Sequence, residues 1–195
     1  MLPSNGKMWR RFSAVTPTYL ITSDIHGSLR VLERLLEKAR RFNAEAILIA
    51  GDLCPSDNPL FSALLHQEIP MHLVRGNCDS SYEFSNASLN LPPLVWRAPW
   101  KGRGLVMTHG DRYPSPYGLD LRKGDIFLYG HTHVPKVQLD ADGILLLNPG
   151  SPTYPRTSLG PSYAILDGEG VSVRAFDDDR FLPSLQYDFF EESDQ

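Results

Sequence analysis

The sequence has little of what marks three common classes of protein. It holds 2 cysteines among 195 residues, too few for the disulfide framework of a small secreted domain. No apolar run approaches the roughly 20 residues that a membrane-spanning helix needs. The formal net charge is −4, so the chain has no broad electrostatic attraction for nucleic acid or anionic membranes. We therefore expect no membrane or nucleic-acid partner, and a reducing, cytoplasmic setting.

What remains is the composition of one globular domain. The hydrophobic fraction is 42% and the charged fraction 22%, and no internal repeat or long linker divides the chain. Residues 1–18 show no clear hydrophobic period, which predicts a mobile N-terminal extension without a signal peptide. Residues 19–177 form the predicted domain, and residues 178–195 form an acid-rich C-terminal tail. The aspartate run at 177–179 is predicted to be a solvated surface.

The first half of the chain alternates strands and helices. Its apolar runs and helical periods predict strands at residues 19–23, 46–50 and 71–74 and helices at residues 28–42 and 58–67. Ser28 and Asn58 can cap the two helices, and Pro59 suits a first helical position. This order predicts parallel strand–helix–strand units.

The second half is rich in proline and glycine, and its apolar runs are short. Strands are predicted at residues 94–98, 105–108, 126–129, 134–139, 144–148, 162–166 and 171–176. Their close spacing predicts hairpins and a second, mostly antiparallel sheet. Two sheets packed face to face, with helices outside, would bury this much apolar sequence.

Five of the predicted strands end in a glycine-flanked cluster of Asp, Asn or His. The run 46–50 stops at Gly51 and Asp52, and a carboxylate beside a dry core is costly unless it is paired or bound to metal. We interpret the five clusters as one site with Asp52 at its centre. Its candidate ligands are Asp24, His26, Asp52, Asn77, His109, His131 and His133.

The candidate ligands combine carboxylate, amide and imidazole groups. This mixture suits Mn²⁺, Fe²⁺, Ni²⁺ or Zn²⁺ better than Ca²⁺ or Mg²⁺, which prefer oxygen. Seven protein ligands are too many for one catalytic ion with an open position, but they fit two ions that share a carboxylate. Two-metal sites are a recurrent solution for the cleavage of phosphate esters.

Five short motifs occur in a fixed order along the chain. They are Asp-x-His at 24–26, Gly-Asp at 51–52, Gly-Asn-x-Asp at 76–79, His-Gly at 109–110 and Gly-His-Thr-His at 130–133. In this order they resemble the calcineurin-like metallophosphoesterases and, with Asn-Pro-Gly-Ser at 148–151, the subgroup of small YfcE-type phosphodiesterases. The resemblance extends over residues 19–176. It implies an α/β (α+β) fold, a four-layer αββα sandwich of two mixed β-sheets flanked by helices.

The resemblance also implies a role for each candidate ligand. Asp24, His26 and His133 would bind a first metal ion, Asn77, His109 and His131 a second, and Asp52 would bridge them. Asp52, Asn77 and His109 are thereby the predicted catalytic residues. The implied cofactor is two divalent transition-metal ions, with Mn²⁺ as first choice and Ni²⁺, Fe²⁺ or Zn²⁺ as alternatives. The implied reaction is hydrolysis of a phosphodiester bond in a small phosphorylated substrate by a metal-bridging hydroxide.

Cys78 departs from the wider family. The family often has a histidine directly after the motif asparagine, whereas this chain, like the YfcE-type subgroup, has a cysteine there. The general acid therefore stays open. We predict that Cys78 is a neutral residue of the substrate pocket, neither nucleophile nor ligand, and that Arg156 contacts a substrate phosphate. Arg75 has either a structural or a phosphate-anchoring role, and His66 and His72 are assigned to the structure.

Three functions stay open at this point. A phosphodiesterase is preferred, because the chain resembles that subgroup and lacks the motif histidine that helps to expel a poor leaving group. A phosphomonoesterase is the second. The third is a non-catalytic protein-binding scaffold like Vps29, which has this fold but has lost several ligands, whereas all seven ligand types are present here. The sequence is also compatible with a homo-oligomer.

Overall fold

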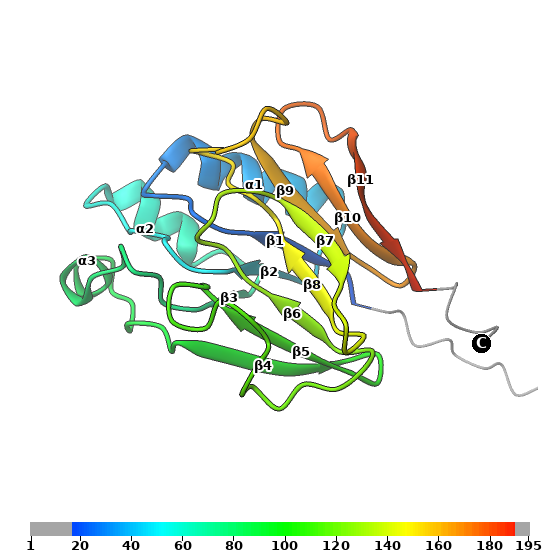
Figure 1. The fold of residues 1–195 in the computed structure, drawn as a ribbon. Helices are drawn as coiled ribbons and strands as arrows, with labels where there is room; N and C mark the ends of the chain where they lie inside the picture. The colour runs from blue at the N-terminus through cyan, green and yellow to red at the C-terminus, as the bar shows by residue number, and fades with distance from the viewer. Residues whose placement is uncertain (1–16, 190–195) are drawn as a thin grey trace, which may run out of the picture.

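The computed structural model describes residues 17–189, so the predicted mobile extension at 1–18 lies almost entirely outside them. Residues 190–195 of the predicted tail also lie outside. Within the described part, eleven strands and three helices form two facing sheets with the helices beside them (Figure 1). The fold class is therefore the predicted one, α/β with two mixed β-sheets and few helices.

The first sheet has six strands in the order β11-β10-β9-β1-β2-β3. They are β1 (Tyr19–Thr22), β2 (Ala46–Ile49), β3 (Met71–Leu73), β9 (Ser162–Leu166), β10 (Gly170–Ala175) and β11 (Phe181–Asp188). β1, β2 and β3 are parallel, as predicted, and helices α1 (Leu29–Arg41) and α2 (Pro59–Leu65) connect them. Asn58 caps α2 as predicted, because its side chain accepts a hydrogen bond from the Leu60 N–H, whereas the Ser28 side chain makes no cap bond.

The second sheet has five strands in the order β4-β5-β6-β8-β7. They are β4 (Val95–Trp100), β5 (Arg103–Thr108), β6 (Ile126–Leu128), β7 (Lys136–Leu139) and β8 (Leu145–Asn148). β5, β6 and β8 are parallel and only the two outer pairs are antiparallel, so the prediction of a mostly antiparallel sheet is wrong. Only the β4–β5 and β7–β8 pairs are hairpins, because the chain returns to the start of the sheet through residues 109–125 between β5 and β6 and through β7 between β6 and β8.

Strands β9 and β10 join the first sheet, although they were predicted in the second. β9 is buried at all five of its residues. Such a strand needs cover on both faces, and beside β1 it has α1 on one face and the second sheet on the other. Tyr163 and Ile165 accordingly pack in the apolar cluster beneath α1, while Ala164 and Leu166 pack in the cluster between the sheets.

The outer face of the second sheet and the short helix α3 differ from what the sequence predicts. Among residues 17–189, no helix covers the outer face of the second sheet, where Leu119 from the segment 109–125 packs on Val106 and Phe127 instead. The fourth, helical layer of the predicted αββα sandwich is therefore not found in the described residues. The short helix α3 (Ser81–Asn86), which the sequence analysis missed, lies near α2, and its Phe84 packs in the cluster beneath α1. A capping box between Ser80 and Glu83 begins α3.

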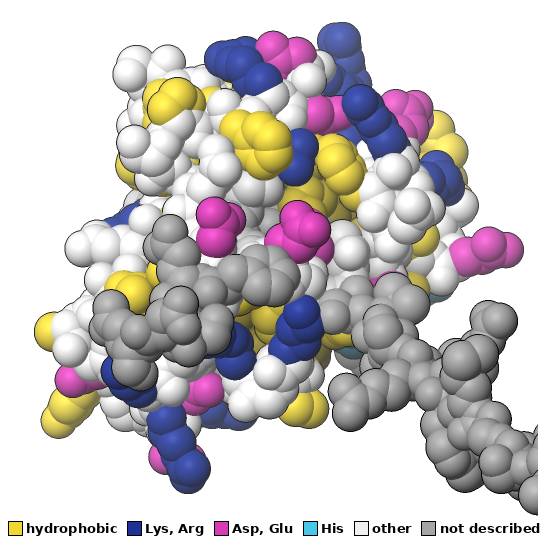
Figure 2. Space-filling model, turned by 90° about the vertical axis from the view of Figure 1, so that its right-hand side faces the viewer, with side chains coloured by type: hydrophobic (Ala, Val, Ile, Leu, Met, Phe, Trp, Pro, Cys, Tyr) yellow, Lys and Arg dark blue, Asp and Glu magenta, His cyan; other side chains and the backbone are white. Residues whose placement is uncertain are grey.

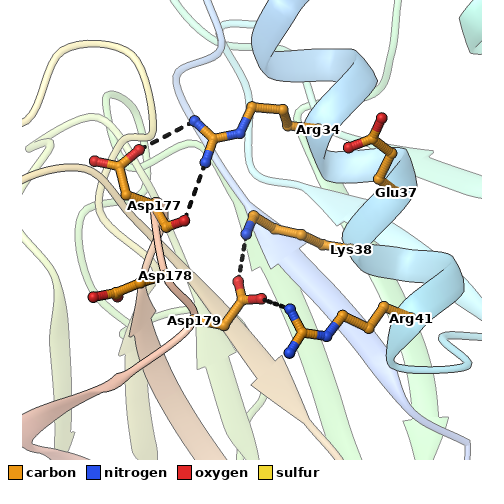
Figure 3. A pocket seen from close by; sticks show the side chains of 7 residues that line it. All are labelled: Arg34, Glu37, Lys38, Arg41, Asp177, Asp178 and Asp179. Carbon is orange, nitrogen blue, oxygen red and sulfur yellow. Dashed lines mark hydrogen bonds and ion pairs between the residues drawn. The ribbon is translucent and has the colours of Figure 1, made fainter.

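The C-terminal segment extends the first sheet beyond the predicted boundary at 177. β11 pairs with β10 as an edge strand, so residues 181–188 of the predicted acidic tail belong to the sheet. Asp179 in the turn before β11 is buried at 8% exposure, and the prediction of a solvated run is wrong for this residue. It forms ion pairs with Lys38 and Arg41 of α1 (Figure 3). It also accepts a hydrogen bond from the Tyr163 hydroxyl at 2.8 Å. Its neighbours at 177 and 178 are exposed, as predicted.

The surface seen in Figure 2 has no broad patch of one charge. Lys and Arg side chains are interspersed there with Asp and Glu. Across residues 17–189, no helix combines the length and apolar character that crossing a membrane requires.

Candidate metal centre

The loops that follow β1 and β2 run side by side beyond the ends of the strands. The Asp24 N–H donates to the Gly51 carbonyl at 3.0 Å, and the His26 N–H donates to the Asp52 carbonyl at 3.0 Å. The parallel pairing of the two strands therefore continues into the polar residues. This local geometry puts the side chains of Asp24 and His26 next to Asp52.

Most of the predicted ligands have an unusual backbone conformation. A positive φ between 49° and 66° is found at Asp24, His26, Asp52, His131 and His133. Residues other than glycine rarely adopt this left-handed region, and each such position costs on the order of 1–3 kcal/mol. Strain of this kind persists only where the surrounding structure fixes it, and it clusters at functional sites.

Asp24, His26 and His133 form one group of candidate ligands. The completely buried Asp24 has its Oδ1 at 3.1 Å from His133 Nε2 and at 4.0 Å from His26 Nε2. Neither contact has hydrogen-bond geometry, so Asp24 Oδ1 and His26 Nε2 are buried polar atoms without a hydrogen-bond partner. Leaving such atoms unsatisfied costs about 1–3 kcal/mol each. A metal ion between them would satisfy both, so these residues fit a metal.

Electrostatics within this group favour a charged pair. Burial alone would raise the pKa of Asp24, but contacts with His133 and Ser23 outweigh it and hold that pKa below its usual value. The contact with Asp24 in turn raises the pKa of His133, against the opposing effects of burial and of the Arg156 charge. The carboxylate is thus ionised and ready to bind a cation.

Asp52 faces ligands on both of its sides. Its Oδ1 lies 3.5 Å from His109 Nε2, and its Oδ2 lies 3.9 Å from His26 Nε2. Asn77 Oδ1 lies 3.1 Å from the same His109 nitrogen. Metal-binding atoms approach within 4.8 Å of one another in the groups Asp24–His26–His133, Asp24–Asp52–His109 and His26–Asp52–Cys78. Asp52 therefore lies between two histidines that belong to different groups.

His131 completes the set on the side of His109. The two imidazole rings lie 5.0 Å apart in an edge-on arrangement. The His131 N–H donates to Asp24 Oδ2 at 3.1 Å, which joins the loop after β6 to the loop after β1. The structure thus brings all seven predicted ligands together in one site.

Carbonyl groups orient two of the histidines. His109 Nδ1 donates to the Ala50 carbonyl at 2.8 Å, and His133 Nδ1 donates to the Tyr154 carbonyl at 2.6 Å. A carbonyl oxygen can only accept, so each Nδ1 carries a proton, and Nε2 is the nitrogen that faces the carboxylates and is left to bind a metal ion. Partners of this kind fix the ring orientation of metal-binding histidines.

Asp79 is an organising residue whose role the sequence analysis missed. Its carboxylate accepts hydrogen bonds from the N–H groups of Asp52 at 3.0 Å, Gly76 at 2.7 Å and Cys54 at 2.9 Å. It thereby ties the loop after β3 to the loop after β2. Its place at the end of the Gly-Asn-x-Asp motif was the available signal.

Cys78 lies at the edge of the site. Its N–H donates to Asp52 Oδ1 at 2.9 Å, and its sulfur accepts from the Asn77 amide at 3.2 Å. Burial and the nearby Asp52 carboxylate raise the pKa of Cys78 to about 11. The thiol is therefore protonated at neutral pH, although its sulfur is within reach of the candidate ligands. Cys54 is also a free thiol.

The other singled-out side chains divide between the site and the scaffold. Arg156 is exposed, and its N–H donates to the His133 carbonyl at 3.1 Å, which places it beside the ligands. His72 stacks on Trp96 with ring centroids 4.8 Å apart, and His66 bonds the Ser62 carbonyl within its own helix turn.

Comparison with known proteins agrees with this geometry. Residues 18–170 match the family described as the calcineurin-like phosphoesterase superfamily domain. The chain belongs to this superfamily. The phosphodiesterase YfcE of Escherichia coli K12 is 32% identical over 182 residues, which cover 85% of this chain and 96% of YfcE.

Solved structures of the superfamily show the same architecture. The E. coli YfcE structure, described as a phosphoesterase, aligns with a TM-score of 0.78 at 29% identity, covering 88% of this chain and 98% of YfcE. Vacuolar protein sorting 29 (Vps29) of Cryptosporidium parvum aligns with a TM-score of 0.65 at 20% identity, covering 89% of this chain and 99% of that one. The second likeness concerns the fold alone. As a calcineurin-like phosphoesterase, this protein belongs with hydrolases of phosphate esters, and divalent metal ions are the cofactors that the superfamily implies.

Proposed function

We propose that this calcineurin-like phosphoesterase hydrolyses phosphodiester bonds with two divalent metal ions. The observation that supports this most strongly is the position of Asp52, whose two carboxylate oxygens face His109 and His26. Asp24, His26 and His133 would hold one ion, Asn77, His109 and His131 the other, and Asp52 would contact both. Bound there, the two ions would activate a water molecule as the nucleophile and offset the charge on the phosphoryl oxygens.

The chain itself supplies orientation and charge. The Ala50 and Tyr154 carbonyls bind Nδ1 of His109 and His133 and so hold the Nε2 atoms of both rings toward the site. Arg156, beside His133, offers a positive charge for the phosphate of a small phosphorylated substrate. Its position next to the ligands supports this role, which was predicted from the sequence.

A diester is the preferred substrate because of Cys78. A thiol is a weak hydrogen-bond donor, so this residue gives little help to a poor leaving group. Mixed nitrogen and oxygen donors support Mn²⁺ as first choice, with Ni²⁺, Fe²⁺ and Zn²⁺ as alternatives.

A panel of matched esters tests this function. The Mn²⁺-loaded protein should hydrolyse bis(p-nitrophenyl) phosphate with a higher kcat/KM than p-nitrophenyl phosphate, with Ni²⁺, Fe²⁺ and Zn²⁺ compared in the same assay. A preference for the monoester would make the protein a phosphomonoesterase. Bound metal without hydrolysis of either ester would favour a scaffold such as Vps29 instead.

A further inference from the structure

The segment 151–156 is fastened to the loop after β1 by side-chain hydrogen bonds. The Ser151 hydroxyl donates to the Asp24 carbonyl at 2.9 Å, and the Thr153 hydroxyl donates to the Ile25 carbonyl at 2.9 Å. Both acceptors belong to the backbone that carries the candidate ligands of β1. The segment therefore forms a fixed wall of the site rather than a loose loop.

The backbone of Tyr154 is held at both of its polar atoms. Its N–H donates to Ser151 Oγ at 2.9 Å, and its carbonyl accepts from His133 Nδ1 at 2.6 Å. On the Tyr154 side these contacts use main-chain atoms only, so they do not depend on the tyrosine side chain. The side chain itself is 60% exposed. The structure thus fixes the backbone that carries this aromatic ring and leaves much of the residue's surface open.

The open ring borders the candidate metal centre. Its centroid lies 5.4 Å from the centroid of the His26 ring, with the planes tilted by 57°. Tyr82, Tyr113 and Tyr117 are also exposed, but of these four tyrosines only Tyr154 has a ring contact with a candidate ligand. On its other side, the segment presents the exposed Arg156 next to His133.

We propose that Tyr154 is a specificity-determining residue that stacks on an aromatic ring carried by an ester substituent of the substrate phosphate. The proposal rests on the proposed function in calling that group part of a substrate. A flat ring gains from a face-on or offset contact with another ring, and an exposed tyrosine offers such a contact at little entropic cost. The shared chemistry is an aromatic ring carried on a phosphoryl group, either directly through the ester oxygen or through a sugar. It can come from a simple aryl ester or from a nucleobase.

Binding of non-hydrolysable ligands tests the proposal apart from catalysis. Calorimetry on the Mn²⁺-loaded protein compares phenylphosphonate with methylphosphonate, and the 5′-phosphonate analogue of adenosine with that of ribose. In at least one pair the aromatic ligand should bind about ten-fold more tightly, the size expected for stacking on one aromatic side chain. The pair that shows the preference identifies the aryl or the nucleobase source.

Substitutions at residue 154 test whether the preference for aromatic ligands comes from the Tyr154 ring. Tyr154→Ala and Tyr154→Leu should abolish it, whereas Tyr154→Phe should keep it. Tyr117→Ala is the matched control, because Tyr117 is 93% exposed and has no ring contact with a candidate ligand. Metal content should be equal in all variants, since the main-chain contacts of residue 154 remain.

Two results would overturn the proposal. One is a wild-type protein without aromatic preference in either pair. The other is an unchanged preference in Tyr154→Ala. Failure of the proposed function would appear separately, as absent diester hydrolysis with these ligand affinities unchanged.

Discussion

At the scale of single residues, the site depends on side chains that glycine neighbours allow to approach. A Cβ atom added at Gly76 would lie 2.0 Å from Asp52 Oδ1, and one added at Gly51 would lie 2.5 Å from the His109 ring. Real Cβ contacts are never this short. Glycine thus lets the Asp52 carboxylate and the His109 imidazole lie against the backbone of neighbouring loops.

Replacing the central carboxylate should abolish most activity. Asp52→Asn keeps the shape of the side chain but removes the charge that faces both groups of ligands. We expect at least a roughly hundredfold loss in kcat/KM, in line with the cost of disturbing metal sites. Asp142→Asn, on the exposed turn before β8, is the control and should leave activity unchanged. Near-normal turnover with full metal content would show that Asp52 does not bridge.

The thiol of Cys78 should be dispensable. With its pKa raised to about 11 by burial and by Asp52, Cys78 is a neutral group at pH 7. Cys78→Ser should therefore retain most activity on aryl diesters in steady-state kinetics. Cys78→His should help alkyl leaving groups more than aryl ones, because imidazolium is a better proton donor. Complete loss of activity in a folded, metal-loaded serine variant would mean that the thiol takes part.

A methyl group at Gly76 should displace Asp52. Gly76→Ala puts a carbon where Asp52 Oδ1 lies, so we expect weakened metal binding, measured by elemental analysis after dialysis. Gly102→Ala provides the comparison, since residue 102 has a φ of +76° but nothing within 4 Å of an added Cβ. Gly102→Ala therefore strains the backbone, but its added Cβ contacts no other atom, so this variant should keep its bound metal. Equal metal content in both variants would contradict the steric argument.

At the scale of elements, α1 and the β10–β11 turn are joined by buried charge. Lys38 lies on the inner side of α1, and its partner Asp179 lies in the turn before β11. Figure 3 shows Arg34 and Arg41 reaching the same turn from the same helix. These ion pairs hold the edge of the first sheet against α1, the helix that covers it.

Removing the carboxylate of Asp179 from these ion pairs should destabilise the protein. Asp179→Asn leaves Lys38 buried without its counter-charge, and we expect a loss of about 3–5 kcal/mol in the free energy of unfolding at pH 7. Asp178→Asn is the matched control, because that side chain is exposed, and it should change stability little. Urea unfolding followed by tryptophan fluorescence measures both.

The same pair should make stability depend on pH. Burial alone would raise the pKa of Asp179, but hydrogen bonds from Lys38 and Tyr163 outweigh it and lower that pKa. The stabilisation is therefore complete above the unfolded pKa of about 3.9 and is lost as the pH falls through the lower folded value. The difference in the free energy of unfolding between the wild type and Asp179→Asn should therefore become smaller as the pH is lowered below 4. A difference that stays constant would show that the charge of Asp179 is not responsible.

At the scale of the whole molecule, the site joins both sheets. Candidate ligands follow β1, β2 and β3 of the first sheet and β5 and β6 of the second. Asn148 at the end of β8 donates to the Gly130 carbonyl at 2.8 Å, which holds the loop that carries His131 and His133. A ligand that binds the ends of both sheets should stabilise the entire fold.

The Tm of the protein should rise as the number of metal ions bound per chain increases. At a free metal concentration a hundred times Kd, one site contributes about 2.7 kcal/mol to the free energy of unfolding. We expect two Mn²⁺ per chain by elemental analysis and a higher Tm than after chelation. Asp24→Asn should reduce both values, whereas the surface variant Asp142→Asn should reduce neither. A stoichiometry that stays near zero would refute the two-metal site.

The sequence by itself determined the chemistry of the site and the local elements. Asp24, His26 and Asp52 could be read from it because each directly follows a short apolar strand, and β1, β2 and β3 are parallel because helices separate them. These features depend on residues close in the chain. The N-terminal half therefore agrees with the prediction in strand direction and in the main helices, whereas α3 was missed because it is short and its only signal is the capping box.

Only the tertiary structure decided how distant segments combine. β9 joins β1, where α1 covers one of its faces and the second sheet covers the other, and β5, β6 and β8 are parallel because residues 109–125 and then β7 return the chain to the same end. Asp179 is buried because its turn meets the basic side of α1, more than a hundred residues earlier in the chain. Tyr154 borders His26 for the same kind of reason. Such pairings depend on which surfaces meet, and no local pattern of residues encodes that choice.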